Sequence, residues 1–426
     1  MSQPSRRIGR ERAALVGLVT GRGRRLDAER SLDELAGLTE AAGASVVLRL
    51  LQERPKPDPA TFLGSGKLAT LAASCAETGA DLVIVDDELS PAQLRHIEEA
   101  VDRKIVDRTQ LILDIFAHRA RTREGKLQVE LAQLKYLLPR LAGSATALSR
   151  LGGGIGTRGP GETKLESDRR RIRSKIHAIS QDIEHVRRRR ARLRERRQKA
   201  SVPTAALVGY TNAGKTTLFN ALTGSAAAAS DALFVTLDPL VRPVRLPDNR
   251  DLLVSDTVGF IDRLPHELVA AFRATLEEVT HADLILHVID AAAPDRERRM
   301  GAVLQVLQEV GAQDVARLDV YNKCDLIGPE ERRRLQDQDP GALCISALDR
   351  QGLAELIDTV ASRLALDVRR LTLTFDPGRA SDLERIARLY RHARVLEHET
   401  RDGRISIVAD VPRRLVGRLE APANDR

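Results

Sequence analysis

The stretch that most constrains this chain is a glycine loop between an apolar run and a helical pattern. The apolar run covers residues 205–208, and the helical pattern continues from Thr217. In this context the spacing G-x-x-x-x-G-K-[ST] predicts a phosphate site in an α/β domain, because backbone N–H groups and the helix dipole point at an anion. We call it the phosphate loop; its residues are Gly209, Tyr210, Thr211, Asn212, Ala213, Gly214, Lys215 and Thr216.

Four side chains are suited to the phosphates and the metal of a bound nucleotide. Lys215 is expected to reach the β and γ phosphates, and the Thr216 hydroxyl to bind Mg²⁺. Asp256 ends a strand pattern and starts the motif Asp256-Thr257-Val258-Gly259. That carboxylate is placed to hold Mg²⁺ through water, and the Gly259 N–H to sense the γ-phosphate. Thr236 lies between these motifs and is the candidate for closing over Mg²⁺ and the γ-phosphate.

Two later motifs are expected to read the base. Asn322-Lys323-Cys324-Asp325 follows a strand pattern, and the Asp325 carboxylate can accept the N1–H and 2-amino hydrogens of guanine, which adenine does not offer. Ser346-Ala347-Leu348 follows another strand pattern and can place a backbone N–H on the guanine O6. The order of these motifs therefore predicts a GTPase that binds GTP and GDP. Beyond the phosphate loop, the expected nucleotide-binding residues are Thr217, Phe234, Val235, Thr236, Asp256, Thr257, Val258, Gly259, Asn322, Lys323, Asp325, Ser346, Ala347 and Leu348, with Lys215, Thr236 and Gly259 acting in catalysis.

One departure from the small signalling GTPases bears on the rate of hydrolysis. Phe260 follows Gly259, where those proteins carry the glutamine that orients the attacking water. Phe260 cannot do this, so hydrolysis by the free protein should be slow. Asn212 matches the position at which potassium-activated GTPases hold a monovalent cation. Our hypothesis is that K⁺ at Asn212 supplies positive charge beside the phosphates.

Length and composition fit a protein of several domains without a membrane span. The chain has 426 residues, 42% of them hydrophobic and 30% charged, and the length suggests about three domains. No apolar run reaches the roughly 18 residues of a span, and the first residues lack an apolar signal core, so we expect a cytoplasmic protein. The three cysteines are far apart and lack metal-site spacing; we interpret them as small buried residues.

The positive charge of the chain is concentrated in one segment. Residues 169–199 contain fourteen Lys and Arg against three Asp and Glu, whereas the net charge of the whole chain is only +8. A charge run is usually a solvated helix face. Here nearly all charges have one sign, and a nucleic acid partner would offset their repulsion.

Upstream of the phosphate loop the sequence predicts an α/β domain and then two long helices. Short strand patterns at 13–19, 46–51, 82–85 and 104–106 alternate with helices, which indicates a parallel sheet with crossover helices. Ser31 and Ser90 are the expected N-caps, Ser90 with Pro91 at the first helical position. The Gly64–Lys67 stretch resembles a phosphate loop only weakly, and a helix start is the favoured interpretation.

The two long helices are expected to pair. One pattern runs from Thr109 to about Leu138, where Pro139 should end it, and the second from Glu162 to about Lys199. Each has a narrow apolar stripe, so we predict an antiparallel coiled-coil hairpin. Its tip, residues 151–162, contains six glycines and Arg158. A flexible turn is the simple alternative, but a glycine loop with an arginine suits close approach to RNA. The RNA-facing candidates are Gly153, Gly154, Gly156, Arg158, Gly159, Arg169, Arg170, Arg171 and Arg173.

Several strings outside the GTPase motifs resemble one family. Asp86–Arg95, Asp107–Phe116, Gln128–Leu134 and Gly152–Glu162, followed by a GTPase with Asp256–Ile261, look like the HflX family over about residues 13–365. The resemblance implies a cytoplasmic GTPase that binds the 50S ribosomal subunit and its 23S rRNA. It also implies that the hairpin loop is pushed toward the peptidyl-transferase centre, that stalled 70S ribosomes are split or rescued under stress, and that the ribosome stimulates GTP hydrolysis. In that family an ATP-binding role has also been attached to the N-terminal domain, but no residue here identifies it.

The resulting prediction is a multidomain α/β protein, expected to act as a monomer. Its parts are an N-terminal α/β domain (1–108), the helical hairpin (109–200), the GTPase domain (201–366) and a small α+β domain (367–426) with a strand at 371–375, a helix at 381–394 and a hairpin around 401–403. Two alternatives stay open: a GTPase of subunit assembly or RNA modification, and a GTP-gated module whose basic helix binds a protein or an acidic membrane.

Overall fold

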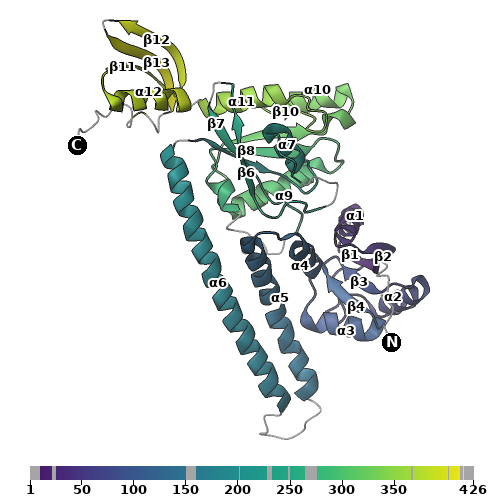
Figure 1. Cartoon of the computed structure of the whole chain (residues 1–426). Coiled ribbons are helices and arrows are strands. Elements are labelled where there is room, and N and C mark those ends of the chain that lie inside the picture. Colours follow the sequence, from purple (N-terminus) through teal and green to yellow (C-terminus); the bar gives the residue numbers. More distant parts are fainter. Residues whose placement is uncertain are drawn as a thin grey trace, which may run out of the picture. The chain divides into compact units, whose positions relative to one another are not determined.

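The structure is a computed structural model that describes residues 10–21, 25–149, 160–200, 202–227, 233–247, 250–263, 276–365, 368–401, 403–412 and 416. Its contacts divide the chain into two units, whose elements are labelled in Figure 1. The first unit comprises Met1–Val186, Ser230–Leu237 and Arg263–Phe272; the second comprises Arg187–Ala229, Asp238–Asp262 and Arg273–Arg426. The predicted four-part division stays a prediction.

The first unit begins with a four-stranded parallel sheet. Its strands are β1 (Arg12–Val19), β2 (Ser45–Glu53), β3 (Leu82–Val85) and β4 (Lys104–Asp107), in the order β2-β1-β3-β4. The helices are α1 (Arg25–Ala41), α2 (Ser65–Thr78), α3 (Pro91–Val101) and α4 (Arg108–Arg119). Apolar side chains of the strands pack with those of α2 and α3 in one core. The predicted parallel sheet with crossover helices is confirmed.

Helix starts in this sheet domain follow their sequence signals in two of three places. Ser90 caps α3 and forms a capping box with Gln93, as the Ser-Pro signal predicts. Gly64 is the N-cap of α2, which confirms a helix start there. The prediction for Ser31 is wrong, because Ser31 is buried inside α1. The helix begins earlier, at Arg25, since good helix formers and the i,i+4 ion pair of Arg25 with Glu29 extend it.

The helical region differs from the prediction in where its first long helix begins and ends. The pattern expected as one helix is two, α4 and α5 (Arg123–Ser149), and α5 continues through Pro139. Proline has no N–H, so the helix loses the hydrogen bond to the carbonyl of Lys135, which is an exposed residue. The next residue, Arg140, is held by the Asp107 carboxylate at 3.0 Å and by the carbonyl of Leu89 at 3.0 Å.

The predicted antiparallel pairing of the long helices is confirmed. The partner of α5 is α6 (Pro160–Ala200), a continuous helix about 60 Å long at 1.5 Å per residue. Leu131 of α5 is buried against Ile179 and Ile183 of α6. An ion pair of 2.5 Å joins Glu130 to Lys175. Figure 1 shows the two helices side by side.

The second unit contains a six-stranded sheet in the order β10-β9-β8-β5-β7-β6. The strands are β5 (Thr204–Val208), β6 (Leu240–Arg245), β7 (Asp251–Asp256), β8 (Leu284–Asp290), β9 (Arg317–Asn322) and β10 (Leu343–Cys344). Helices α7 (Lys215–Thr223), α9 (Arg296–Glu309), α10 (Pro329–Gln338) and α11 (Leu353–Ala365) and the short 3-10 helix η1 (Cys324–Leu326) belong to the same part. Every neighbouring pair is parallel except β6 with β7. The loops that follow β5, β7, β9 and β10 therefore meet at one edge.

The C-terminal part of the second unit is a small α+β module, as predicted. Its antiparallel sheet has the order β11-β13-β12, with β11 (Val368–Phe375), β12 (Arg394–Arg401) and β13 (Arg404–Pro412). Helix α12 (Ala380–His392) places Leu389 against Phe375 and Ile407 of the sheet. Among the helices within the described ranges, none combines the length and the apolar character that crossing a membrane requires.

Candidate functional site

The phosphate loop lies between β5 and α7, in the context that its spacing predicts. Helix α7 starts at Lys215 with Gly214 as its N-cap. Gly214 has a φ of +90°, and a Cβ there would collide with the side-chain amide of Asn322. Glycine is required at this position because both the backbone angle and the close neighbour exclude a side chain. The loop thus delivers the N–H groups of the α7 start, which have no partner within the helix, to the carboxyl edge of the sheet.

Lys215 is buried in the centre of this loop. Its amine donates hydrogen bonds to the carbonyl oxygens of Gly209 at 3.0 Å and Tyr210 at 2.8 Å. Burial lowers the pKa of Lys215 to about 8, and the negative charge of Asp256 only partly offsets this effect. An incoming phosphate would supply the negative charge that favours the protonated amine.

The two predicted metal ligands that follow β5 and β7 are in direct contact. The Thr216 hydroxyl donates to Asp256 Oδ2 at 2.8 Å, and Asp256 is fully buried. Oxygen ligands of this kind fit Mg²⁺, which commonly completes its coordination with water and nucleotide phosphates. The described residues hold no cluster of three or more His, Cys, Asp or Glu. A cation at this site would therefore depend on oxygens that a nucleotide brings.

The segment after Asp256 runs alongside the phosphate loop. The Thr211 amide donates to the carbonyl of Phe260 at 2.7 Å, and the Phe260 amide donates to the carbonyl of Gly209 at 3.1 Å. The Phe260 side chain is 2% exposed and belongs to the core. A Cβ on Gly259 would lie 3.1 Å from Lys215 Nζ, so this glycine passes close to the lysine amine.

Asn322 joins the base-reading motifs to the phosphate loop. Its buried side chain donates to the Ala213 carbonyl at 2.9 Å and accepts from the Ala347 amide at 2.9 Å. Lys323 has a positive φ of 63° and pairs with Asp290 at 2.9 Å. Asp325 is exposed, within η1. A carboxylate in that position is open to an incoming base.

The loop after β10 is held in place by hydrogen bonds to other residues of the chain. Ser346 and Gln351 exchange two backbone hydrogen bonds of 3.1 and 3.0 Å, and the Ala347 amide is bound by Asn322. Leu348 is 77% exposed. A hydrogen bond to the guanine O6 would thus come from the Leu348 amide. If the Ala347 amide made this bond instead, it would first have to give up its hydrogen bond to Asn322.

The candidate Thr236 belongs to the first unit, whereas the other predicted phosphate and metal residues belong to the second. Its neighbour Phe234 is buried, with its ring 4.6 Å from that of Phe116 in an edge-to-face arrangement. Leu233 reaches Gly37 of α1, where an added Cβ would lie 3.2 Å from the Leu233 side chain. Residues 233–237 are therefore fixed by the sheet domain of the first unit, and the role of Thr236 stays a prediction.

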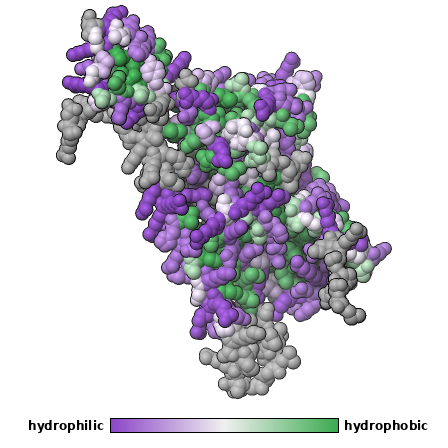
Figure 2. Space-filling model, viewed as in Figure 1, coloured by the Kyte–Doolittle hydropathy of each residue, from purple (hydrophilic) through white to green (hydrophobic). Residues whose placement is uncertain are grey.

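Four of the predicted RNA-facing arginines belong to α6. Arg170, Arg171 and Arg173 are exposed, and Arg169 is half-buried. Figure 2 shows mostly hydrophilic side chains along α6, on the left of the view. The remaining candidates Gly153, Gly154, Gly156, Arg158 and Gly159 lie outside the described residues.

Comparison with known proteins identifies the family. Models described as GTP-binding GTPase N-terminal, GTP-binding GTPase Middle Region and 50S ribosome-binding GTPase match residues 29–117, 119–197 and 204–323. The GTPase HflX of Caldanaerobacter subterraneus subsp. tengcongensis is 46% identical over 410 residues, covering 96% of this chain and 93% of that protein. This chain belongs to the HflX family of GTPases. The Escherichia coli GTPase HflX is 43% identical, with 89% of both chains covered. A crystal structure of a Sulfolobus solfataricus GTP-binding protein with GDP matches 83% of this chain and 98% of its own at 24% identity, with a TM-score of 0.43.

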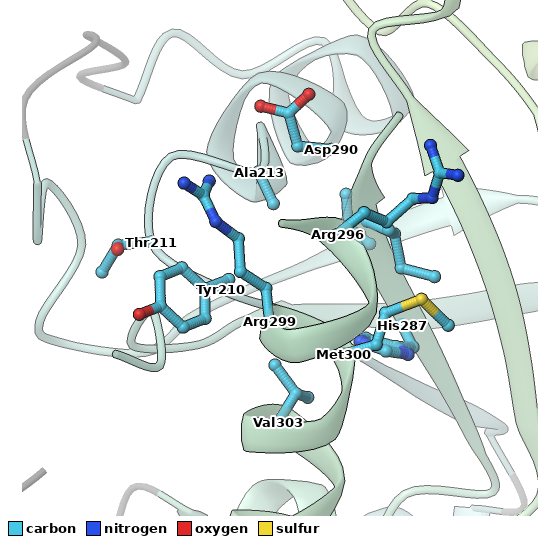
Figure 3. Close-up of a pocket in the computed structure, with 11 residues that line it drawn as sticks. Tyr210, Thr211, Ala213, His287, Asp290, Arg296, Arg299, Met300 and Val303 are labelled. Atoms are coloured by element: carbon cyan, nitrogen blue, oxygen red, sulfur yellow. The ribbon is translucent and has the colours of Figure 1, made fainter. Parts of the chain in front are cut away.

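In this HflX-family chain the sequence motifs did not reveal a group of side chains that supports the phosphate loop from behind. The Asp262 amide donates to the Tyr210 hydroxyl at 2.8 Å, and Arg298 of α9 pairs with the Asp262 carboxylate at 2.8 Å. Arg299 lies over the Tyr210 ring at 5.2 Å, beside the small pocket drawn in Figure 3. Tyr210 was predicted only as part of the loop, and no local sequence signal marks Asp262 or Arg298. Together they tie the segment after Gly259 to the loop and to α9.

Proposed function

We propose that this protein binds the large (50S) ribosomal subunit, hydrolyses GTP to GDP and phosphate there, and splits or rescues stalled ribosomes under stress. The observation that supports this most is the exposed arginines of α6, which packs against α5, in a chain whose 204–323 region matches a 50S ribosome-binding GTPase. Such a protein would work as a monomer in the cytoplasm, where ribosomes are.

In this proposal each residue of the nucleotide site makes its own contact with the nucleotide. Lys215 would leave the Gly209 and Tyr210 carbonyls and donate to the β and γ phosphates, with the loop amides around them. The Gly259 N–H, which passes close to Lys215, would donate to the γ-phosphate. Asp325 would accept the guanine hydrogens, and Asn322 would keep the base loop in register with the phosphate loop.

Mg²⁺ would be held by Thr216 and, through water, by Asp256, with Thr236 joining from residues 233–237 in the GTP state. Bound there, it would neutralise charge on the β and γ phosphates. Asn212 is exposed at the loop tip with a φ of 59°, which leaves it open to a K⁺ ion beside the phosphates. Because Phe260 cannot position water, the ribosome would have to complete the site.

The hairpin would carry the RNA contacts. Arg169, Arg170, Arg171 and Arg173 would contact the phosphates of 23S rRNA, and the glycine tip with Arg158 would approach the peptidyl-transferase centre. The GTP state would act on this binding through residues 233–237, because Phe234 packs on Phe116 one helix before α5. Binding driven by phosphate contacts of this kind weakens as salt rises.

The test is GTP turnover by the purified protein in potassium buffer, with and without 50S subunits. We expect slow turnover alone and strong stimulation by 50S, with no activity in Lys215→Ala. The GTP form should then release free subunits from intact 70S ribosomes in sucrose gradients. Equal rates in KCl and NaCl would remove the K⁺ hypothesis alone.

Other outcomes would favour the alternatives. Stimulation by precursor particles but not by mature 50S would indicate a GTPase of subunit assembly or RNA modification. Binding to anionic vesicles with no response to ribosomal particles would indicate a membrane or protein partner for α6. Unchanged slow turnover with every ribosomal particle would contradict the proposed function.

A further inference from the structure

Two cysteines meet where the guanine loops come together. Cys324 starts η1 directly after Lys323, and Cys344 ends β10, two residues before Ser346. The Cys324 amide donates to the Ile345 carbonyl at 3.0 Å, and the Ile345 amide donates to the Tyr321 carbonyl at 2.8 Å. These backbone bonds on both sides fix the two residues next to each other although they are far apart in the sequence.

The two thiols lie close enough that each affects the pKa of the other. The Cys324 thiol donates its proton to the Tyr321 carbonyl at 3.2 Å. The two side chains share a small core with Ile289, Tyr321 and Leu335, and they are 7% and 4% exposed. The third cysteine, Cys75, is fully buried in the first unit and belongs to a different core.

The surroundings make the two sulfurs chemically unequal. The neighbouring Cys324 thiol, and then the nearby Arg332, lower the pKa of Cys344 against the effect of burial. The neighbouring Cys344 thiol, together with burial, raises the pKa of Cys324. Cys344 is therefore the more acidic of the two thiols and the one that forms the thiolate more readily. A low-pKa thiol with a second thiol beside it is the arrangement found at redox-sensitive sites.

We propose that Cys324 and Cys344 form a reversible disulfide when the protein meets hydrogen peroxide, and that this bond weakens binding of guanine nucleotides. The inference goes beyond the ribosomal role, and its second half rests on the proposed guanine site at Asp325 and Ser346–Leu348.

The reaction is balanced with peroxide as the two-electron oxidant. The Cys344 thiolate attacks one peroxide oxygen, the O–O bond breaks, and the hydroxide that leaves takes up a proton to become water. The sulfenic acid formed on Cys344 is then attacked by the Cys324 sulfur. The S–O bond breaks, the thiol proton of Cys324 is lost, and a second water leaves. Two thiols and one peroxide give one disulfide and two waters, and a dithiol reductant reverses the change.

The consequence for the nucleotide follows from where the bond would form. A disulfide brings its sulfurs to about 2.05 Å, closer than two thiols in van der Waals contact lie. Closing that distance would pull the segment at Cys324 toward β10, and with it Asp325, the next residue. The Asn322 side chain, which holds Ala347 and Ala213, lies in the same loop. Base-reading groups on both loops would thus shift together.

The experiment treats the full-length, nucleotide-free protein with hydrogen peroxide and measures two things. Mass spectrometry of a tryptic digest should show peptide 324–332 joined to peptide 335–350, and the link should disappear with dithiothreitol. Fluorescence titration with a labelled GDP should show an affinity at least about tenfold lower after oxidation and restored after reduction. Prior saturation with GDP should slow the reaction, because the base would cover both loops.

Matched variants separate the pair from the other cysteine. Cys324→Ser and Cys344→Ser should bind GDP like the reduced protein and keep that affinity after peroxide, whereas Cys75→Ser should respond like wild type. If either variant folds poorly, the peptide link in wild type still decides the first half of the proposal. Absence of that link while Cys344 is oxidised further, or a linked protein with unchanged GDP affinity, would overturn it. If Asp325→Ala leaves the GDP affinity of reduced protein intact, the guanine site is wrong but the disulfide result stands.

Discussion

The side-chain amide of Asn322 donates a hydrogen bond of 2.9 Å to the backbone carbonyl of Ala213. The first residue belongs to the base-reading motif and the second to the phosphate loop, and 109 positions separate them. Asn322 is 2% exposed, and its oxygen also accepts from the Ala347 amide. One buried side chain therefore sets the spacing of the three loops that are proposed to hold the base and the phosphates.

Asn322→Ala should uncouple these loops. It leaves the Ala213 carbonyl and the Ala347 amide without their partner, at a cost of about 1–3 kcal/mol, or roughly 5- to 150-fold in GDP affinity. The measurement is calorimetric titration with GDP, and Asn220→Ala on α7 provides the control for loss of an asparagine elsewhere in the domain. An affinity equal to that of wild type would mean that the loops keep their spacing without Asn322.

Lys215 should make nucleotide binding depend on protons. Burial holds its pKa near 8 in the free protein, and phosphates beside the amine would raise it. Between pH values of about 8 and the ordinary lysine pKa of 10.5, GDP binding must then be accompanied by uptake of a proton. The affinity for GDP should therefore fall as the pH rises through this range. Calorimetry in two buffers with different ionisation enthalpies, about one unit above the pKa, should show uptake approaching one proton. No uptake there would mean that the amine is already protonated before GDP binds.

The contact of Thr216 with Asp256 predicts how magnesium supports turnover. Thr216→Ala removes a proposed metal ligand and should lower ribosome-stimulated turnover by about a hundredfold, while Thr216→Ser keeps the hydroxyl and should stay within a few-fold of wild type. Asp256→Asn should raise the magnesium concentration needed for half-maximal turnover. Equal magnesium dependence in all three variants would show that other groups bind the metal.

Sequence patterns predicted the parallel sheet of the first unit, and they marked the motifs of the candidate site because several GTPase motifs directly follow an apolar strand. Parallel strands bring such motifs to one edge, which is why Thr216 and Asp256 meet. The errors at Ser31 and Pro139 have one cause: residues around them, not the signal residue, decide where those helices begin and end.

The sequence motifs could not predict contacts between side chains that are far apart along the chain. Nothing near Arg298 in the sequence indicates that it pairs with Asp262, and nothing near Phe116 indicates a partner in Phe234. The two cysteines likewise become neighbours only when two loops meet. Residue type and spacing along the chain do not encode these pairs, because tertiary packing selects them.

Phe116 should hold residues 233–237 in place. Phe116→Ala removes a ring that is fully buried and leaves Phe234 without its edge-to-face partner. The amides of residues 233–237 should then exchange hydrogen faster in mass-spectrometric measurements, while the exchange of β5 and α7 stays the same. Phe375→Ala in the C-terminal module is the matched control and should leave residues 233–237 unaffected. Unchanged exchange after Phe116→Ala would show that Leu233 and Gly37 suffice to hold them.

The exposed arginines of α6 predict how binding to the large subunit depends on salt. Each side chain that neutralises an RNA phosphate adds to the slope of log affinity against log salt, so Arg170→Gln with Arg171→Gln should reduce the slope by up to about 2 and weaken binding most at low salt. Arg333→Gln with Arg334→Gln on α10 removes the same charge from another exposed helix and should leave the slope nearly unchanged. Co-sedimentation with 50S subunits across a salt series measures both. If the slope falls by the same amount in both double variants, the salt dependence arises from the net charge of the protein and not from contacts of α6 with RNA.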